Sequence, residues 1–329
     1  MDKLNENIIT LYNKWKSGYV RKETDLEEKI KPMREWVEGH FPEERYDNFS
    51  YYKDGIIYNG DFKMLDSSLI DGELPYPFIE ITGDFSIYHS GIKSFKNFPS
   101  TIGGDFLCEH CVSLTSLDGL PPTINGDIKI GYCPQITSIQ KGILPKKVNG
   151  SFAIYDCTCL TSLENCVEDV EIDFDCSGCG KLTSLEGAPK SVGGDFNCNE
   201  CYDILTLNGV PDVIEGDFKC SCCSSLTNLE GSPRVVKHHF ICASCSSLVS
   251  LEGAPDELHG FSSYNCSALT SLKGLPSVIE GDVNLAKCTS LKNLRGITNI
   301  TGDLTVDSAF TQNKRRGLKV DGIVYYIRK

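Results

Sequence analysis

The chain has 329 residues, of which 40% are hydrophobic and 23% are charged, and it contains 30 glycines. This composition is typical of a folded chain with many tight turns and excludes wholesale disorder. The 32 basic and 45 acidic residues give a net charge of -13, whose field would repel nucleic acid and an anionic membrane surface. We therefore expect generic binding to neither.

The N-terminal residues and the cysteines predict where the chain is located. The start, from Met1 to Asn7, carries charges where a signal peptide needs an apolar core, and no run of about 18 apolar residues occurs in the chain. The 17 cysteines are an odd number and make up roughly 5% of the chain, less than in small disulfide-held secreted scaffolds. We therefore expect reduced thiols and a cytoplasmic location.

The first 82 residues differ from the rest of the chain. Residues 1–50 show helical spacing of apolar side chains, with a capping-box start at Thr24 and Glu27 and an interruption near Pro32. They are predicted to form a helical N-terminal cap. Residues 51–82 are predicted to form an irregular turn that leads into the repeats, and their Gly-Asp-Phe triplet is typical of a degenerate first repeat.

A repeat, with most copies 21 or 22 residues long, occupies residues 83–306. Each copy contains a triplet similar to Gly194-Asp195-Phe196, and positions are numbered below from its glycine, so that Asp195 is at Gly+1. Phe196 and Cys198 alternate with polar residues, which is the pattern of a short strand with one buried face. One copy cannot bury its own apolar face, so we expect about eleven turns to stack around a parallel β-sheet.

The repeat resembles the leucine-rich repeats, in the short Cys-containing form found in bacteria, phages and large DNA viruses. The resemblance rests on the segment Phe196-x-Cys198-x-x-Cys201 and on Leu182-x-x-Leu185. It implies an α/β solenoid that recognises proteins through a concave face. Some bacterial relatives carry a ubiquitin-ligase domain after the array, but only about 25 residues follow here, which is too few for such a domain.

Residues 307–329 are predicted to close the array as a short β cap. Val320 and the run from Val324 to Ile327 flank Asp321-Gly322, and this pattern predicts a hairpin. Solenoids need such ends because their terminal turns would otherwise expose the core.

The cysteines form two columns along the repeats, which allow two interpretations. Five Gly+4/Gly+7 pairs read C-x-x-C, and two thiolates at this spacing can face one metal ion. Alternatively, the thiols fill the core, with the Gly+7 cysteine satisfying the backbone of the turn. We favour the second interpretation, and Cys159, Cys166 and Cys222 are predicted surface thiols outside both columns. The Gly+4 column holds Cys108, Cys176, Cys198, Cys220 and Cys242, and the Gly+7 column holds Cys111, Cys133, Cys157, Cys179, Cys201, Cys223, Cys245, Cys266 and Cys288.

An aspartate occupies Gly+1 in most turns. Stacked turns would place these carboxylates about 4.8 Å apart, where two unit charges repel by about 1 kcal/mol in water and by several-fold more near a protein surface. Hydrogen bonds from backbone N–H groups at the glycine turn would offset this repulsion. The alternative is that the carboxylates face a basic ligand or a cation, and both roles are compatible. The column holds Asp84, Asp105, Asp127, Asp173, Asp195, Asp217, Asp282 and Asp303.

We expect a non-enzymatic intracellular scaffold that binds a protein through a concave, acidic face. No histidine recurs beside a serine or cysteine in a way that suggests a nucleophile and its base, and no phosphate loop or dinucleotide fingerprint occurs, so neither catalytic residues nor a cofactor are expected. A basic patch on the partner would complement the face. If the chain is viral or from a phage, it would sequester a factor in the host cytoplasm. The alternative function is metal binding or redox chemistry by the C-x-x-C rows. The candidate partner-binding residues are Asp173, Asp175, Asp195, Asn197, Asp217, Lys219, His239 and Ile241, with Asp175 expected to have no role in the turn.

Overall fold

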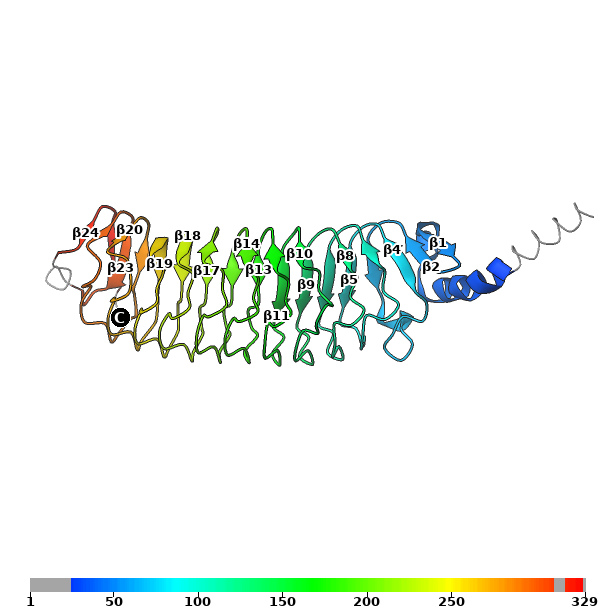
Figure 1. The fold of residues 1–329 in the computed structure, drawn as a ribbon, viewed down its shortest axis with the longest axis horizontal. Coiled ribbons are helices and arrows are strands. Elements are labelled where there is room, and N and C mark those ends of the chain that lie inside the picture. Colours follow the sequence, from blue (N-terminus) through cyan, green and yellow to red (C-terminus); the bar gives the residue numbers. More distant parts are fainter. Residues whose placement is uncertain (1–24, 311–316, 328–329) are drawn as a thin grey trace, which may run out of the picture.

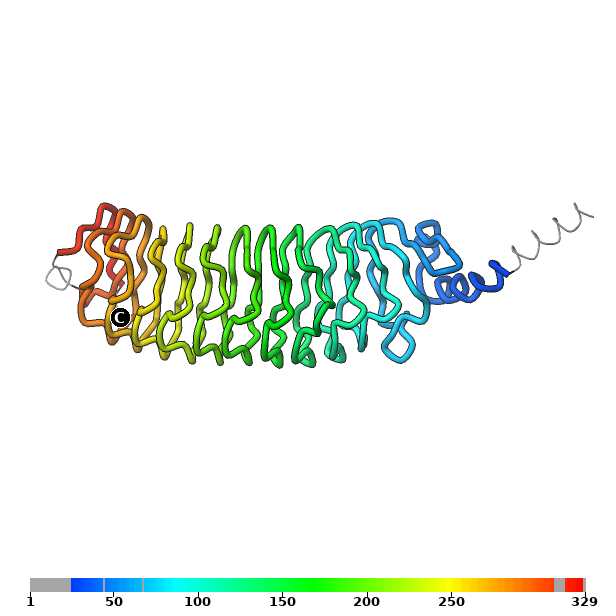
Figure 2. The backbone as a smooth tube through the Cα atoms, in the orientation of Figure 1, coloured from blue at the N-terminus to red at the C-terminus, as the bar shows by residue number. Residues whose placement is uncertain are grey.

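Each repeat contributes one strand to a single long sheet. In the computed structural model, which describes residues 25–310 and 317–327, these strands pair in parallel, so that Phe174, Phe196 and Phe218 lie side by side. The result is a parallel β-solenoid of about 12 turns, which runs nearly straight in Figures 1 and 2. The strands of this sheet are β3 (Phe62–Met64), β5 (Phe85–Tyr88), β7 (Phe106–Glu109), β9 (Ile128–Gly131), β11 (Phe152–Tyr155), β13 (Phe174–Asp175), β15 (Phe196–Asn197), β17 (Phe218–Lys219), β18 (Val235–Ile241), β19 (Glu257–Ser262), β21 (Val283–Asn284), β23 (Leu304–Asp307) and β25 (Val324–Ile327), with β16 (Val213–Ile214) paired to β18.

A second row of short strands precedes the glycine corner of most turns and forms a side wall of the solenoid. These strands also pair in parallel, as Val170 does with Val192. They were not predicted, because only one or two residues of each point inward. The row consists of β4 (Phe78–Ile81), β6 (Thr101–Ile102), β8 (Thr123–Ile124), β10 (Lys147–Val148), β12 (Asp169–Val170), β14 (Ser191–Val192), β20 (Val278–Ile279), β22 (Asn299–Ile300) and β24 (Lys319–Val320), and it continues through the first halves of β18 and β19.

The returning side of each turn consists of bends and turns. Leu182 and Leu185 are fully buried there, as the repeat pattern predicts. No residue from 83 to 306 is helical, so the α/β label of the predicted fold class does not describe the repeats. The physical reason is length: 21 or 22 residues include two strands and two corners, which leaves too few residues for a helix.

The core contains a column of buried apolar side chains, mostly phenylalanines, in which Ile128, Val283 and Leu304 take the same position. The rings of Phe174 and Phe196 are 4.9 Å apart between centroids, and those of Phe196 and Phe218 are 5.4 Å apart. All three phenylalanines are fully buried. Each ring therefore packs against the same ring of the turn before and the turn after it, which is the nearest-neighbour contact that holds a solenoid together.

One helix covers the N-terminal end of the array, and its described part spans residues 25–40. The predicted interruption near Pro32 is wrong, because the helix continues through it. Pro32 is exposed and removes only one helical hydrogen bond, whereas Trp36 and Val37 on the other face are buried against the first turns. The helix start predicted at Thr24 lies outside the described residues.

The segment between the helix and the first repeat closes the N-terminal end. It contains two 3-10 helices, η1 (Glu43–Asn48) and η2 (Asp66–Ser68), and an antiparallel pair, β1 (Phe49–Tyr52) and β2 (Gly55–Tyr58). The predicted degenerate first repeat is confirmed, since β3 pairs in register with β5. Phe62 stacks on Phe85 at 5.6 Å between ring centroids, so the core extends beyond the turn at Gly83.

The C-terminal end is not the predicted hairpin. β24 pairs in parallel with β22, and β25 pairs in parallel with β23. The two strands therefore belong to the two rows of one further turn, and Gly322 is its corner glycine. The pattern around Asp321-Gly322 suits a hairpin, but the neighbouring turn offers both strands a parallel partner along their whole length.

Removing either of two core rings should destabilise the protein to a similar extent. Phe196→Ala and Phe85→Ala should each lower the free energy of unfolding by about 3–5 kcal/mol, because both rings are fully buried between two neighbours. Chemical denaturation of the two variants measures this. A much smaller loss for Phe85→Ala would show that the array ends at that turn.

Candidate protein-interaction surface

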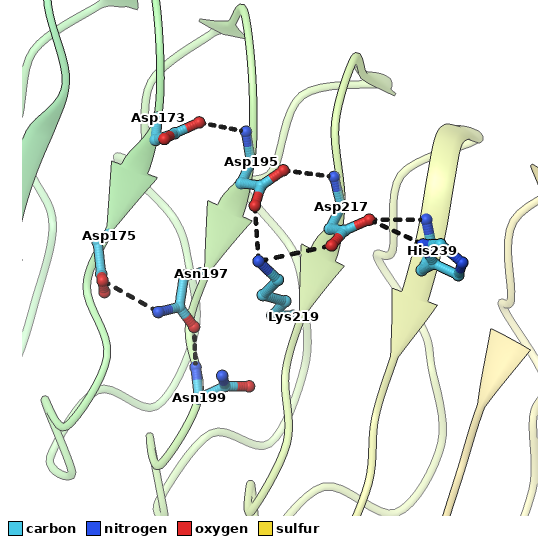
Figure 3. Close-up of polar contacts among 8 residues, drawn as sticks. All are labelled: Asp173, Asp175, Asp195, Asn197, Asn199, Asp217, Lys219 and His239. Atoms are coloured by element: carbon cyan, nitrogen blue, oxygen red, sulfur yellow. Dashed lines mark hydrogen bonds and ion pairs between the residues drawn. The ribbon is translucent and has the colours of Figure 1, made fainter. Parts of the chain in front are cut away.

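The outer face of the long sheet carries the eight predicted partner-binding residues on or directly before four neighbouring strands, and Figure 3 shows all of them except Ile241. Cross-strand pairing aligns Asp175 with Asn197, Asn197 with Lys219, and Lys219 with Ile241. Asp173, Asp195 and Asp217 lie directly before β13, β15 and β17, and His239 occupies the same position on β18. The structure therefore brings the predicted residues together as one surface, although Figure 2 shows no marked concavity.

Each aspartate at Gly+1 accepts a hydrogen bond from the backbone of the next turn. Asp173 Oδ1 accepts from the Asp195 N–H at 2.7 Å, and Asp195 Oδ1 accepts from the Asp217 N–H at 2.8 Å. Asp217 Oδ1 accepts from the His239 N–H at 3.0 Å. The same bond links each successive pair of turns in two further stretches of the array. In the first stretch the acceptors are Asp61, Asp84, Asp105 and Asp127, and in the second they are Asp282 and Asp303. The structural role predicted for the aspartate column is thus confirmed, and the repeated bond forms an aspartate ladder.

The ladder explains why a glycine precedes the aspartate. A Cβ atom on Gly194 would lie 2.3 Å from Asp173 Oδ1, so the carboxylate of one turn occupies the side-chain space of the next. Ser151 replaces the aspartate in one turn, and the following turn has Ile172 in place of glycine. His238 is an exception: it occupies the glycine position although the turn before it has an aspartate, Asp217. This exception lies where the pairing of β18 with β19 shifts register.

Lys219 neutralises the centre of the surface. Its ammonium lies 2.6 Å from Asp195 Oδ2 and 3.5 Å from Asp217 Oδ2 (Figure 3). Burial of Asp217 opposes its ionisation, but the hydrogen bonds from His239 and the charge of Lys219 outweigh this and lower the pKa of Asp217. The interactions of ionised Asp217 with His239 and Lys219 therefore stabilise the fold above the pKa of an unfolded aspartate. This stabilisation is lost as the pH falls through the lowered pKa of Asp217. Because Lys219 offsets the charges of Asp195 and Asp217, the net negative charge at the centre of the surface is smaller than the number of aspartates suggests.

Asp175 has a structural role, contrary to prediction. Its Oδ1 accepts from the Ser177 N–H at 2.7 Å, and its Oδ2 accepts from Asn197 Nδ2 at 3.0 Å. Asn197 Oδ1 in turn accepts from the Asn199 N–H at 3.1 Å. A short carboxylate or amide at Gly+3 can reach the backbone two residues later, which the repeat pattern alone did not reveal. Charge reversal at Asp175 would therefore disturb the turn as well as the surface.

An aromatic stack on the N-terminal half of the sheet was also missed. The rings of His89 and His110 lie 4.4 Å apart and nearly parallel, and the Tyr132 ring stacks on His110 at 4.3 Å. These three residues share the Gly+6 position, and this shared position is the signal that could have predicted their contact. Tyr155 lies beside them and donates from its hydroxyl to Glu109 Oε1 at 2.5 Å.

The two cysteine columns lie in the core, as the favoured interpretation predicted. The Cys201 thiol donates to the Cys176 carbonyl at 3.3 Å, and the Cys223 thiol donates to the Cys198 carbonyl at 3.3 Å. Burial raises the pKa of Cys198 to about 12, which opposes the thiolate that metal binding or redox chemistry requires. Of the three predicted surface thiols, Cys159 is exposed, whereas Cys166 and Cys222 are half-buried.

The glycine and the aspartate of neighbouring turns should show energetic coupling. Gly194→Ala should destabilise the protein by about 1–3 kcal/mol, because the new methyl group meets the Asp173 carboxylate. Asp173→Ser removes that carboxylate and reproduces the Ser151 turn, so the double variant should be more stable than the sum of the single losses. Denaturation of all four proteins measures the coupling. Strictly additive losses would contradict the proposed clash.

Thiol alkylation should proceed in a defined order. Cys159 should react first in native buffer because it is exposed, and Cys222 should follow, since burial and then Glu200 raise its pKa. The columns should react only after unfolding, and the denatured chain serves as the control for full labelling. Mass spectrometry of partly labelled protein gives the order. Labelling of Cys198 as fast as that of Cys159 would contradict the core assignment.

Among the residues that the structure describes, no group of three or more His, Cys, Asp and Glu side chains is arranged to hold a metal ion. The helix within the described ranges is too short and too polar to cross a membrane. Comparisons with protein-family models, with curated proteins and with solved structures gave no significant match.

Proposed function

We propose that the protein is a non-enzymatic scaffold that binds a protein partner with a basic patch through the outer face of the long sheet. The observation that carries the proposal is the aspartate ladder. Its hydrogen bonds fix Oδ1 of each aspartate against the next turn and leave Oδ2 directed away from that bond, as Figure 3 shows for Asp195 and Lys219. Carboxylates held in this way need little reorganisation to receive basic side chains.

The charge of this face is not uniform, and its distribution refines the proposed binding region. Lys129 pairs with Asp127 at 2.7 Å, and Lys219 pairs with Asp195 and Asp217, so these turns are partly neutralised. Asp84, Asp105, Asp173, Asp282 and Asp303 form no ion pair with any residue in the described ranges. A basic partner would therefore gain most at the two flanks and at Asp173, with the other predicted central residues contributing polar contacts between them.

The family and the location form part of the same proposal. Buried leucines on the returning side and thiols bonded to the turn backbone support kinship with the short leucine-rich repeats. Thiols that serve as core side chains suit a reducing compartment, which supports an intracellular site of action. If the chain comes from a virus or phage, the partner would be a host factor that the array sequesters.

Charge variants at Gly+3 test the function without breaking the ladder. Leu107→Lys should neutralise Asp84 and Asp105 as Lys219 does for its neighbours, and should slow association with a basic partner. Lys219→Gln should expose two carboxylates and speed association, with a steeper dependence on salt. The matched control is Thr123→Lys, which adds the same charge at an exposed position of the side row.

The partner is first captured from the native cytoplasm with the intact protein, and the association rate is then measured for each variant. We expect roughly two- to five-fold changes in rate at low salt, in opposite directions for the two test variants. Melting temperatures show whether each variant remains folded. Equal rates for all three variants would exclude the outer face of the long sheet as the binding surface.

A further inference from the structure

A hollow of about 360 Å³ opens on the outer face of the long sheet, at the edge of the predicted residues, of which His239 and Ile241 border it. It lies where the aspartate ladder is interrupted, because the turn between His239 and Asp282 has Gly260 at Gly+1. A glycine at Gly+1 and the small Ser262 at Gly+3 leave space that side chains fill in other turns. The side chains around the hollow are those of Ile241, Tyr325 and the two carboxylates Asp282 and Asp303. Phe261 and Val283 also border it, but their side chains are buried in the core.

The two aspartates of the hollow are oriented by the ladder. Asp282 Oδ1 accepts from the Asp303 N–H at 2.7 Å, and Asp303 Oδ1 accepts from the Ile323 N–H at 2.7 Å. Neither Oδ2 atom has a hydrogen-bond or ion-pair partner among residues 25–310 and 317–327. The hollow therefore has two fixed carboxylates whose second oxygens are available.

The chain itself shows what such a pair of carboxylates binds. Asp195 and Asp217 have the same Gly+1 positions and the same hydrogen bond as Asp282 and Asp303, and Lys219 places its ammonium against both of their Oδ2 atoms. The position equivalent to Lys219 in the later turns is Thr305, which is too short to reach and carries no charge. The later pair thus has the geometry of an ammonium site without an internal lysine.

We propose that this hollow receives a lysine side chain of the protein partner. The Ile241 side chain and the Tyr325 ring suit the methylene groups of lysine, and the two Oδ2 atoms suit its ammonium. An arginine fork fits less well, because Oδ1 of each carboxylate already accepts from the backbone and two-point pairing is lost. This inference rests on the proposed function in one respect, namely that the lysine belongs to a protein partner; the ammonium site itself is argued from the two carboxylates.

The test uses a small probe, so that it does not depend on the partner. Nα-acetyl-lysine N-methylamide is titrated into the full-length protein while the NMR signals of the Asp303 and Ile323 amides are followed. The norleucine analogue, which has a similar stem without the ammonium, is the control. We expect a saturable shift of both amides with the lysine probe only, and roughly five-fold weaker binding to Asp303→Asn.

Thr305→Lys is the most informative variant. It should place an ammonium between Asp282 and Asp303, abolish the response to the probe and leave the melting temperature unchanged or higher. Thr123→Lys on the side row carries the same charge change and should bind the probe as the original protein does. If Thr305→Lys does not fold, Asp303→Asn decides the question.

Three results would overturn the proposal: equal binding of the norleucine probe, an unchanged response of Thr305→Lys, or saturation by calcium chloride but not by the lysine probe at equal ionic strength. The last result would identify the hollow as a cation site. Probe binding without capture of any protein by the sheet would instead refute the proposed function and leave the ammonium site standing. Capture of a protein partner by the sheet without binding of the lysine probe would refute the ammonium site and leave the proposed function standing.

Discussion

The hydrogen bond from the backbone N–H of one turn to the aspartate of the turn before it is the interaction on which the rest of the structure depends. Stacking equal turns places equal charges side by side, and the bond offsets their repulsion by giving each carboxylate a donor. It also requires glycine at the next corner, because the carboxylate occupies the space of a side chain. One interaction therefore accounts for both residues of the Gly-Asp signature and for the register between turns.

The same bond decides what the surface can do. An aspartate that served only as a surface charge could adopt many orientations, whereas these carboxylates are held by the backbone and present one oxygen outward. Internal lysines occupy that oxygen at Lys129 and Lys219. Substitution at Gly+3 can thus close or open an acidic position without altering the ladder, so a repeated structural bond also provides adjustable sites for recognition.

The sequence predicted the features that every turn repeats. Stacking, the parallel sheet, the buried columns and the position of the eight surface residues all follow from a short period and from alternating apolar residues. Local features were predicted less well. The helix passes through Pro32 because tertiary packing of Trp36 outweighs one lost hydrogen bond, and the strands around Gly322 pair with the preceding turn instead of with each other. The hollow beside Gly260 depends on a single replacement, and the role of Asp175 recurs at Asn197 and Asn284, so a pattern averaged over many turns conceals both.

Amide hydrogen exchange tests the ladder most directly. The N–H groups of Asp195, Asp217 and Asp303 each donate to a carboxylate, whereas no acceptor for the Asp282 N–H exists among the described residues, since Gly260 precedes it in the stack. We predict that the first three amides exchange at least about tenfold more slowly than that of Asp282 in the folded protein at neutral pH. Equal exchange at all four positions would show that the carboxylates do not hold the turns together.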